Sequence, residues 1–306
     1  MLTIKRILVP RDFSACSEYA LMQGLDLAQR HGAELHVLYA EVLYADAYAP
    51  TPRQASDAAL RGRLGESLGD AVPVRRAVVR DVAAAPAIVS YAAEHEIDLI
   101  VMGTHGRRGV PRLLLGSTAE EVVRTAPCPV LTVRGKGGEA MPFGSILVPV
   151  DFSEHARMAL RHARVLAATL GARLDLLHVV EDQLHPAFYS FTVHSLYDLR
   201  PDIDERAQEE LEAFFEATDG PDVDAAFHVR RGHAAREIVA FAGEAHDRLI
   251  VMATHGLRGL DHFLMGSVAE RVVRRAPCPV LTLKSFGTSL LGEPLRARAP
   301  EAAPAS

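Results

Sequence analysis

The chain has 306 residues, of which 49% are hydrophobic and 24% are charged, with a formal net charge of −6. This length suits two ordinary domains, and the composition is normal for a globular protein. The acidic balance, with no basic stripe on any predicted helix, argues against a nucleic-acid partner. No uncharged apolar run reaches the roughly twenty residues that span a bilayer, so no membrane segment is expected.

The first half alternates strand-like and helix-like segments. Buried strands are predicted at 6–10, 34–40, 74–79, 98–103 and 129–133, and helices at 15–31, 85–96 and 117–126. Ser14 is a candidate cap for the first helix, and Gly32 is the residue expected to end it. Strands that alternate with helices and lack outward polar residues indicate a parallel sheet covered on both faces.

The second half repeats the first. Residues 6–14 return at 145–153, and residues 99–133 return at 249–283 with 24 of 35 positions identical. Repeat 2 also carries extra residues between about 181 and 228, including an aromatic segment near 185–199. That segment either packs on its own domain or forms a lid or partner surface. A helix predicted at 204–217, with Leu211, Phe214 and Phe215 on one face, is longer than its counterpart.

These observations give a domain plan. Domain 1 is expected at 1–134 and domain 2 at 145–285, joined by a Gly-rich linker at 135–144. Residues 286–306 are rich in Pro, Ala and Arg, without an apolar period, and are expected to form a disordered tail.

The chain has three cysteines, and none lies in a CxxC pair. Cys128 and Cys278 occupy the same place in two copies of "APCPVLT", and we expect both to be small buried side chains. No apolar segment typical of a secretory signal precedes the first predicted strand. A reduced, cytoplasmic compartment is therefore expected.

Glycines cluster where the predicted strand 98–103 ends. Gly103 and Gly106 follow this strand, and Gly116 and Ser117 open the next helix. Ligands of open parallel sheets bind at the carboxyl ends of strands, and the free N–H groups of a helix start attract anions. The pattern predicts a phosphate seat, and the second copy keeps it except that Ala253 replaces the first glycine.

A capping box is the alternative interpretation of the same residues. Ser117 and Glu120 match S-x-x-E, as do Ser267 and Glu270, and such a cap needs no ligand. The cap and the seat can also coexist. No G-x-G-x-x-G follows the first strand, which argues against a dinucleotide site, and no P-loop motif occurs. For Asp12 and Asp151, at the ends of the first strands, the commoner role is a turn hydrogen bond.

The combination of "ILVPxDFS", "IVMGTHG", "LLLGS" and "APCPVL", in this order, resembles the universal stress protein family. The resemblance covers roughly 5–133 and 145–284, so the chain resembles a tandem member. It implies two tandem open, mostly parallel five-stranded sheets with helices on both faces, a Rossmann-like fold of the adenine nucleotide alpha hydrolase type. It also implies that the last strands of the two halves pair as an intramolecular pseudo-dimer, and such units can pair again as a homodimer.

The resemblance further implies an adenine-nucleotide site for ATP, with a divalent cation such as Mg²⁺. Carried over to the first half, the nucleotide-binding positions are Asp12, Ala40, Met102, Gly103, Gly106, Gly116, Ser117 and Thr118. In the second half they are Asp151, Val179, Met252, Ala253, Gly256, Gly266, Ser267 and Val268. The Ala253 methyl group either crowds only the ribose side or, if φ must be positive there, excludes the ligand. We therefore expect repeat 1 to bind ATP more surely than repeat 2, with two equal sites as the alternative.

By this resemblance the protein is a cytoplasmic ATP-binding stress-response regulator or scaffold, with little or slow hydrolysis. Two alternatives stay open. One is a nucleotide hydrolase or transferase that uses Asp12 or His105, although no catalytic constellation is evident. The other is an interaction scaffold that binds no nucleotide.

Overall fold

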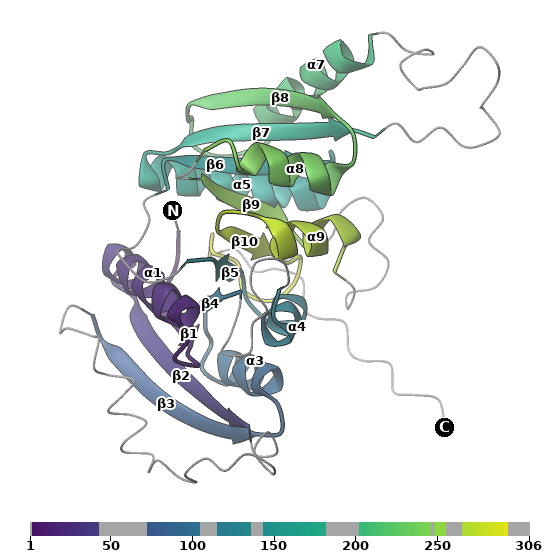
Figure 1. Cartoon of the computed structure of the whole chain (residues 1–306). Helices are drawn as coiled ribbons and strands as arrows, with labels where there is room; N and C mark the ends of the chain where they lie inside the picture. Colours follow the sequence, from purple (N-terminus) through teal and green to yellow (C-terminus); the bar gives the residue numbers. More distant parts are fainter. Residues whose placement is uncertain are drawn as a thin grey trace, which may run out of the picture.

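The computed structural model describes residues 2–42, 72–104, 115–135, 143–181, 202–245, 248–254 and 265–292. Its strands form one ten-stranded sheet in the order β3-β2-β1-β4-β5-β10-β9-β6-β7-β8. Figure 1 shows the first half, which contains β1 to β5, at one end of this sheet and the second half, with β6 to β10, at the other.

Each half contributes five strands and the helices between them. The first half contains β1 (Arg6–Pro10), α1 (Ala15–His31), β2 (Glu34–Val42), β3 (Val74–Asp81), α3 (Ala84–Glu94), β4 (Leu99–Gly103), α4 (Ser117–Thr125) and β5 (Val130–Val133). The second half contains β6 (Ser145–Val150), α5 (Glu154–Leu170), β7 (Arg173–Val180), α7 (Ile203–Glu216), β8 (Ala225–Arg231), α8 (Ala234–Ala242), β9 (Arg248–Ala253), α9 (Ser267–Arg275) and β10 (Val280–Leu283).

The first helix of each half begins and ends at the residues that the sequence indicates. The side chains of Ser14 and Ser153 cap α1 and α5 by accepting a backbone N–H three residues on, at 3.2 and 3.1 Å. Gly32 and Gly171 end these helices with φ of 63° and 66°. Glycine adopts this left-handed conformation without a steric penalty, so it ends a helix cleanly.

Helices cover both faces of the sheet. The helices α1, α5 and α7 pack on one face, and α3, α4, α8 and α9 pack on the other. In β1, Ile7 and Val9 point to the first face and Leu8 to the second, and all three are fully buried. Burial on both faces explains why these strands are continuous apolar runs rather than alternating ones.

The halves join through their last strands, which we call the seam. Within each half neighbouring strands are parallel, but β5 and β10 pair antiparallel, with Leu131 opposite Leu281. Thr132 and Thr282 are buried on the seam, and each hydroxyl donates to a carbonyl of the facing strand, at 3.2 and 3.1 Å. The expected fold class and intramolecular pseudo-dimer are confirmed.

Several segment ends differ from the expectations, and α3, expected at 85–96, spans Ala84–Glu94. β2 and β3 continue to Val42 and Asp81 because the two strands stay paired to those residues. Residues 286–292 do not form part of a disordered tail: Leu290 is buried, and its carbonyl accepts the N–H of Thr3 at 2.7 Å. The side chain of Leu290 packs into the hydrophobic core and so holds this stretch in place. Residues 293–306, most of the linker and the aromatic segment near 185–199 lie outside the described residues.

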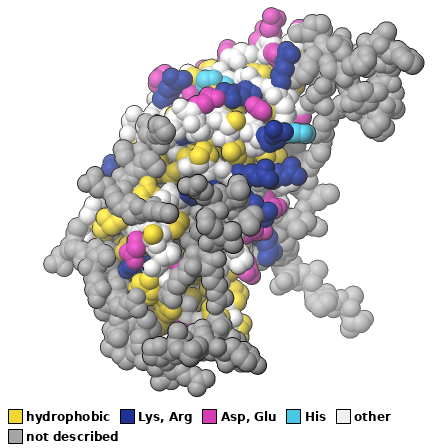
Figure 2. Space-filling view, in the orientation of Figure 1, with side chains coloured by type: hydrophobic (Ala, Val, Ile, Leu, Met, Phe, Trp, Pro, Cys, Tyr) yellow, Lys and Arg dark blue, Asp and Glu magenta, His cyan; other side chains and the backbone are white. Residues whose placement is uncertain are grey.

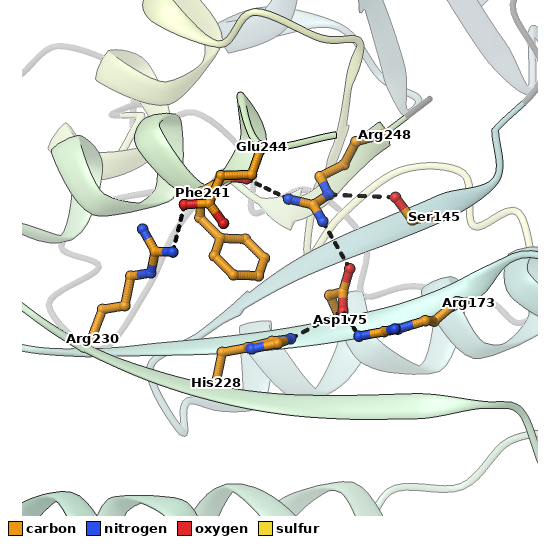
Figure 3. Close-up of polar contacts among 8 residues, drawn as sticks. All are labelled: Ser145, Arg173, Asp175, His228, Arg230, Phe241, Glu244 and Arg248. Carbon is orange, nitrogen blue, oxygen red and sulfur yellow. Dashed lines mark hydrogen bonds and ion pairs between the residues drawn. The ribbon is translucent and has the colours of Figure 1, made fainter. Parts of the chain in front are cut away.

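A buried ionic cluster lies at the amino ends of the strands of the second half (Figure 3). Asp175 of β7, almost fully buried, binds the guanidinium of Arg248 at 3.0 Å. Its other oxygen binds Arg173 and His228, each at 3.0 Å. Arg248 also donates to the Ser145 hydroxyl at 3.4 Å, so the buried charges are paired from several sides.

The first half has different chemistry at the equivalent place. His36 of β2 stands where the second half has Asp175, and its Nδ1 shares a 3.0 Å hydrogen bond with the Tyr91 hydroxyl. The Tyr91 ring in turn stacks on His95, with centroids 3.9 Å apart. Burial lowers the pKa of His36, although the carboxylate of Glu34 acts in the opposite direction. A largely neutral cluster therefore replaces the ionic one.

Two features of the described residues relate to the nucleic-acid and membrane partners considered from the sequence. On the face shown in Figure 2, basic and acidic side chains are interspersed over the second half. Among the described residues, no helix has both the length and the apolar character needed to cross a membrane.

Candidate functional site

The turn between β1 and α1 has the same conformation as the turn between β6 and α5. The carboxylate of Asp12 accepts the backbone N–H two residues on at 3.0 Å, and Asp151 does likewise at 3.1 Å. Between these partners lie Phe13 and Phe152, with φ of 62° and 61°. Left-handed backbone is uncommon in aromatic residues and concentrates at functional sites. The aspartates thus make the turn hydrogen bond and shape the loop at the strand end.

The loops between β4 and α4 and between β9 and α9 are closed at their bases by matching hydrogen bonds. The N–H of Gly116 donates to the carbonyl of Thr104 at 2.8 Å, and Gly266 donates to Thr254 at 2.8 Å. The two threonine N–H groups donate to the last residues of β5 and β10, at 3.1 and 2.9 Å. Both halves therefore hold the start of the following helix in the same position relative to the strand ends.

The starts of α4 and α9 are not capping boxes, and that interpretation was wrong. The N-cap residues are Gly116 and Gly266, in extended backbone, and neither helix has a side-chain cap hydrogen bond. Ser117 and Ser267 are the first helical residues and are exposed, so their hydroxyls do not cap the helix. The first turn of a helix has N–H groups without intrahelical partners, and they carry the positive end of the helix dipole.

Gly103 is required by its close packing against the start of α1. A Cβ atom on Gly103 would lie 2.8 Å from the sulfur of Cys16 and 3.0 Å from its backbone carbonyl group. Neither Gly103 nor Ala253 has a positive φ. The methyl group of Ala253 therefore does not demand a strained backbone, which removes the backbone reason for expecting a weaker second site and leaves crowding of the ribose side as the other.

The remaining predicted residues lie at strand ends. Ala40 and Val179 are half-buried near the carboxyl ends of β2 and β7, paired with Val79 and Arg230 of the neighbouring strands. The side chains of Met102 and Met252 are buried in the core between the sheet and α3, α4, α8 and α9. Only the backbone of these methionines is therefore suited to contact a ligand.

The structure brings most of the first-half candidates to one edge of the sheet, which we call the carboxyl edge. Pro10 of β1 pairs with Leu38 of β2, and β4 lies on the other side of β1, so the ends of these three strands are neighbours. Asp12, Ala40 and Gly103 follow or occupy these ends. Gly106 and Gly256, with the histidines beside them, lie outside the described residues.

Sequence reasoning missed two side chains at this edge. Arg11 is 5% exposed, and its guanidinium is paired with Glu18. The cationic partner of Glu18 is therefore the residue that immediately precedes Asp12. Cys16 is half-buried near the start of α1, and its thiol lies 3.4 Å from the carbonyl of Val133. The signal was a departure between the repeats, because the second half has valine and histidine at these positions.

Residues 3–134 and 142–284 each match the model of the universal stress protein family. The chain belongs to this family. Two solved structures share its tandem architecture at a sequence identity that shows the fold alone. A functionally unknown protein of Pseudomonas aeruginosa is 22% identical with a TM-score of 0.65, covering 92% of this chain and 93% of that one. A universal stress protein of Archaeoglobus fulgidus is 22% identical with a TM-score of 0.60, covering 91% and 98%.

Other universal stress proteins correspond to about one half of the chain. Universal stress protein MJ0531 of Methanocaldococcus jannaschii is 33% identical over 150 residues, which are 49% of this chain and 86% of the relative. A universal stress protein of Thermus aquaticus is 37% identical over 146 residues, 46% of this chain and 99% of the relative. These shorter relatives agree with a duplicated universal stress protein unit.

Proposed function

We propose that this universal stress protein binds an adenine nucleotide, ATP, in each half. The phosphates would lie at two seats: the first seat is the start of α4 (Gly116, Ser117, Thr118), and the second is the start of α9 (Gly266, Ser267, Val268). Asp12 and Asp151, with the ends of β2 and β7, would line the nucleoside side. The protein would act as a nucleotide-dependent stress-response regulator or scaffold in the cytoplasm, with little or slow hydrolysis.

The observation that carries this proposal is the state of the two helix starts. Each begins at a glycine without a side-chain cap, beside an exposed serine, at the carboxyl ends of parallel strands. Unpaired N–H groups in this position bind phosphate in many α/β proteins. A capping side chain in place of either glycine would add only about a few tenths of a kcal/mol, so the fold gives up little by leaving these N–H groups for a ligand.

Two equal seats are favoured over one. Their loop bases have the same hydrogen bonds, at 2.8 Å in both halves. The backbone at Ala253 has no positive φ, so its methyl group is no obstacle to the same conformation. The preference for the first half therefore no longer has support from backbone strain.

Mg²⁺ would arrive with the nucleotide rather than bind a cage of protein side chains. Among the described residues, no group of three His, Cys, Asp or Glu side chains is arranged to hold a metal ion. Mg²⁺ usually keeps several waters and is bound chiefly through phosphate oxygens. The exposed hydroxyls of Ser117 and Ser267 could add one ligand each, and the metal would neutralise phosphate charge.

Calorimetric titration with ATP and Mg²⁺ tests the proposal. The wild-type chain should bind about two nucleotides. Gly116→Glu and Gly266→Glu should each bind about one, because the new carboxylate would fill one seat and repel the phosphates of the nucleotide. Gly144→Glu adds the same charge at an exposed position outside both seats and should still bind about two. No heat of binding in the wild-type chain would overturn the proposal.

A further inference from the structure

The two seat helices are held at their far ends by residues of the opposite half. Ala126, the C-cap residue that follows α4, is fully buried. The ammonium group of Lys284, which follows β10, donates to the carbonyl of Ala126 at 2.7 Å. Lys284 is 3% exposed, so both members of this contact are removed from water. A buried carbonyl that lost such a donor would be left unsatisfied.

The reciprocal contact is made by Arg134, which occupies the position after β5 that Lys284 occupies after β10. Its guanidinium donates to the carbonyl of Arg274 and lies 3.4 Å from that of Val273, both in the last turn of α9. Basic side chains at a helix C-terminus bind the free carbonyls and interact favourably with the negative end of the helix dipole. Each half therefore supplies a basic side chain that binds the C-terminal end of the other half's seat helix.

A third contact joins the first turns of the same two helices. The guanidinium of Arg274 binds Glu120 of α4 at 3.1 Å and Glu270 of α9 at 2.9 Å. These glutamates lie in the first turns of the seat helices, near the proposed phosphate positions. The arginine offsets two negative charges that would otherwise repel a phosphate.

The anchoring residues also adjoin the loop bases. The carbonyl of Val133, immediately before Arg134, accepts the N–H of Thr104 at 3.1 Å. The carbonyl of Leu283, immediately before Lys284, accepts the N–H of Thr254 at 2.9 Å. One short stretch of chain thus closes the loop of its own half and holds the seat helix of the other.

We propose that Lys284 is a positioning residue for the first seat and Arg134 for the second, so that each nucleotide site is complete only with the opposite half in place. This inference rests on the proposed function. α4 has nine residues and is only about 13 Å long, so a shift at its anchored end reaches the seat with little loss.

The test measures ATP binding at one seat at a time in the full chain. In a Gly266→Glu background, which leaves the first seat, Lys284→Met should weaken ATP binding about three- to tenfold. Arg134→Met in the same background should change it less than about twofold, because its partner helix carries the blocked seat. Arg275→Met, which removes an exposed arginine of α9, is the control for lost positive charge.

The Gly116→Glu background, which leaves the second seat, should show the reverse order, with Arg134→Met the weakening change. This version uses a half-exposed arginine and so covers the case in which Lys284→Met fails to fold. A merely structural role would weaken both seats equally or neither, and either result would overturn the inference while the proposed function stands. Absence of ATP binding in the wild-type chain would instead overturn the proposed function, and this inference with it.

Discussion

At the carboxyl ends of their strands the two halves keep the same hydrogen bonds: Gly116 donates to Thr104 and Gly266 to Thr254, both at 2.8 Å. At the amino ends of the strands they differ. The first half buries a hydrogen bond between a histidine and a tyrosine, and the second buries the ion pair of Asp175 with Arg248. Geometry is retained at the strand ends where a ligand is proposed, whereas the amino ends of the strands need only that their buried polar groups have partners.

The ionic cluster of the second half should be the most sensitive place. Asp175→Asn leaves Arg248 buried without a charged partner, so the free energy of unfolding should fall by about 3–5 kcal/mol in urea denaturation. Arg173→Met removes a half-exposed partner of the same carboxylate and should cost less than about 1 kcal/mol. Equal losses for the two variants would show that burial of the pair does not decide its contribution.

Exchanging the residues that differ at the loop base sharpens the comparison. Gly103→Ala should lower the free energy of unfolding by about 1–3 kcal/mol, because the new methyl group meets Cys16, including its backbone. Ala253→Gly, the reverse exchange in the second half, should cost about 1 kcal/mol or less. Thermal denaturation of both variants measures this, and a Gly103→Ala variant as stable as wild type would contradict the packing role of Gly103.

The histidine of the first half predicts a loss of stability in acid. Burial lowers the folded-state pKa of His36, and burial with nearby Arg30 also lowers the pKa of His31. Below about pH 6.5 the unfolded chain binds protons that the folded chain does not, so stability falls as pH drops. His36→Gln should lose less melting temperature than wild type between about pH 7.5 and pH 5.5. Identical losses would exclude His36 as a source.

The smallest effect expected is a difference in thiol reactivity. Burial raises the pKa of both Cys128 and Cys278 to about 12, whereas Cys16 is only half-buried. Thiolates are the reactive species, so iodoacetamide should label Cys16 in the native chain and the other two only after unfolding. Labelling of all three at equal rates would show that the cores around the repeated "APCPVLT" segments open readily.

Much of the fold follows from local patterns. Continuous apolar runs between helical segments predict the parallel sheet, and Ser14, Gly32 and their repeats mark the ends of the first helices. The pairing of the last strands at the seam was expected from the resemblance to the universal stress protein family. The extent of β2 and β3 and the packing of Leu290 depend on contacts distant in sequence, which such patterns do not contain.

The candidate site was predicted less completely for a similar reason. The sequence offers two candidate N-caps for α4, Gly116 and the Ser117 of S-x-x-E. Only the backbone conformation shows that Gly116 is the N-cap. Gly103 faces Cys16, a residue 87 positions earlier, so its packing role is invisible to spacing. The contacts of Lys284 and Arg134 cross the seam between the halves, and no local motif marks them.

The most direct test of two matching nucleotide seats is to purify the chain without added nucleotide, denature it and identify the released small molecules by mass spectrometry. The account predicts ATP or ADP approaching two per chain, lowered in Gly116→Glu and in Gly266→Glu to similar extents. Release of no nucleotide, together with no rise in melting temperature on adding ATP and Mg²⁺, would contradict it. The two helix starts would then serve only the fold.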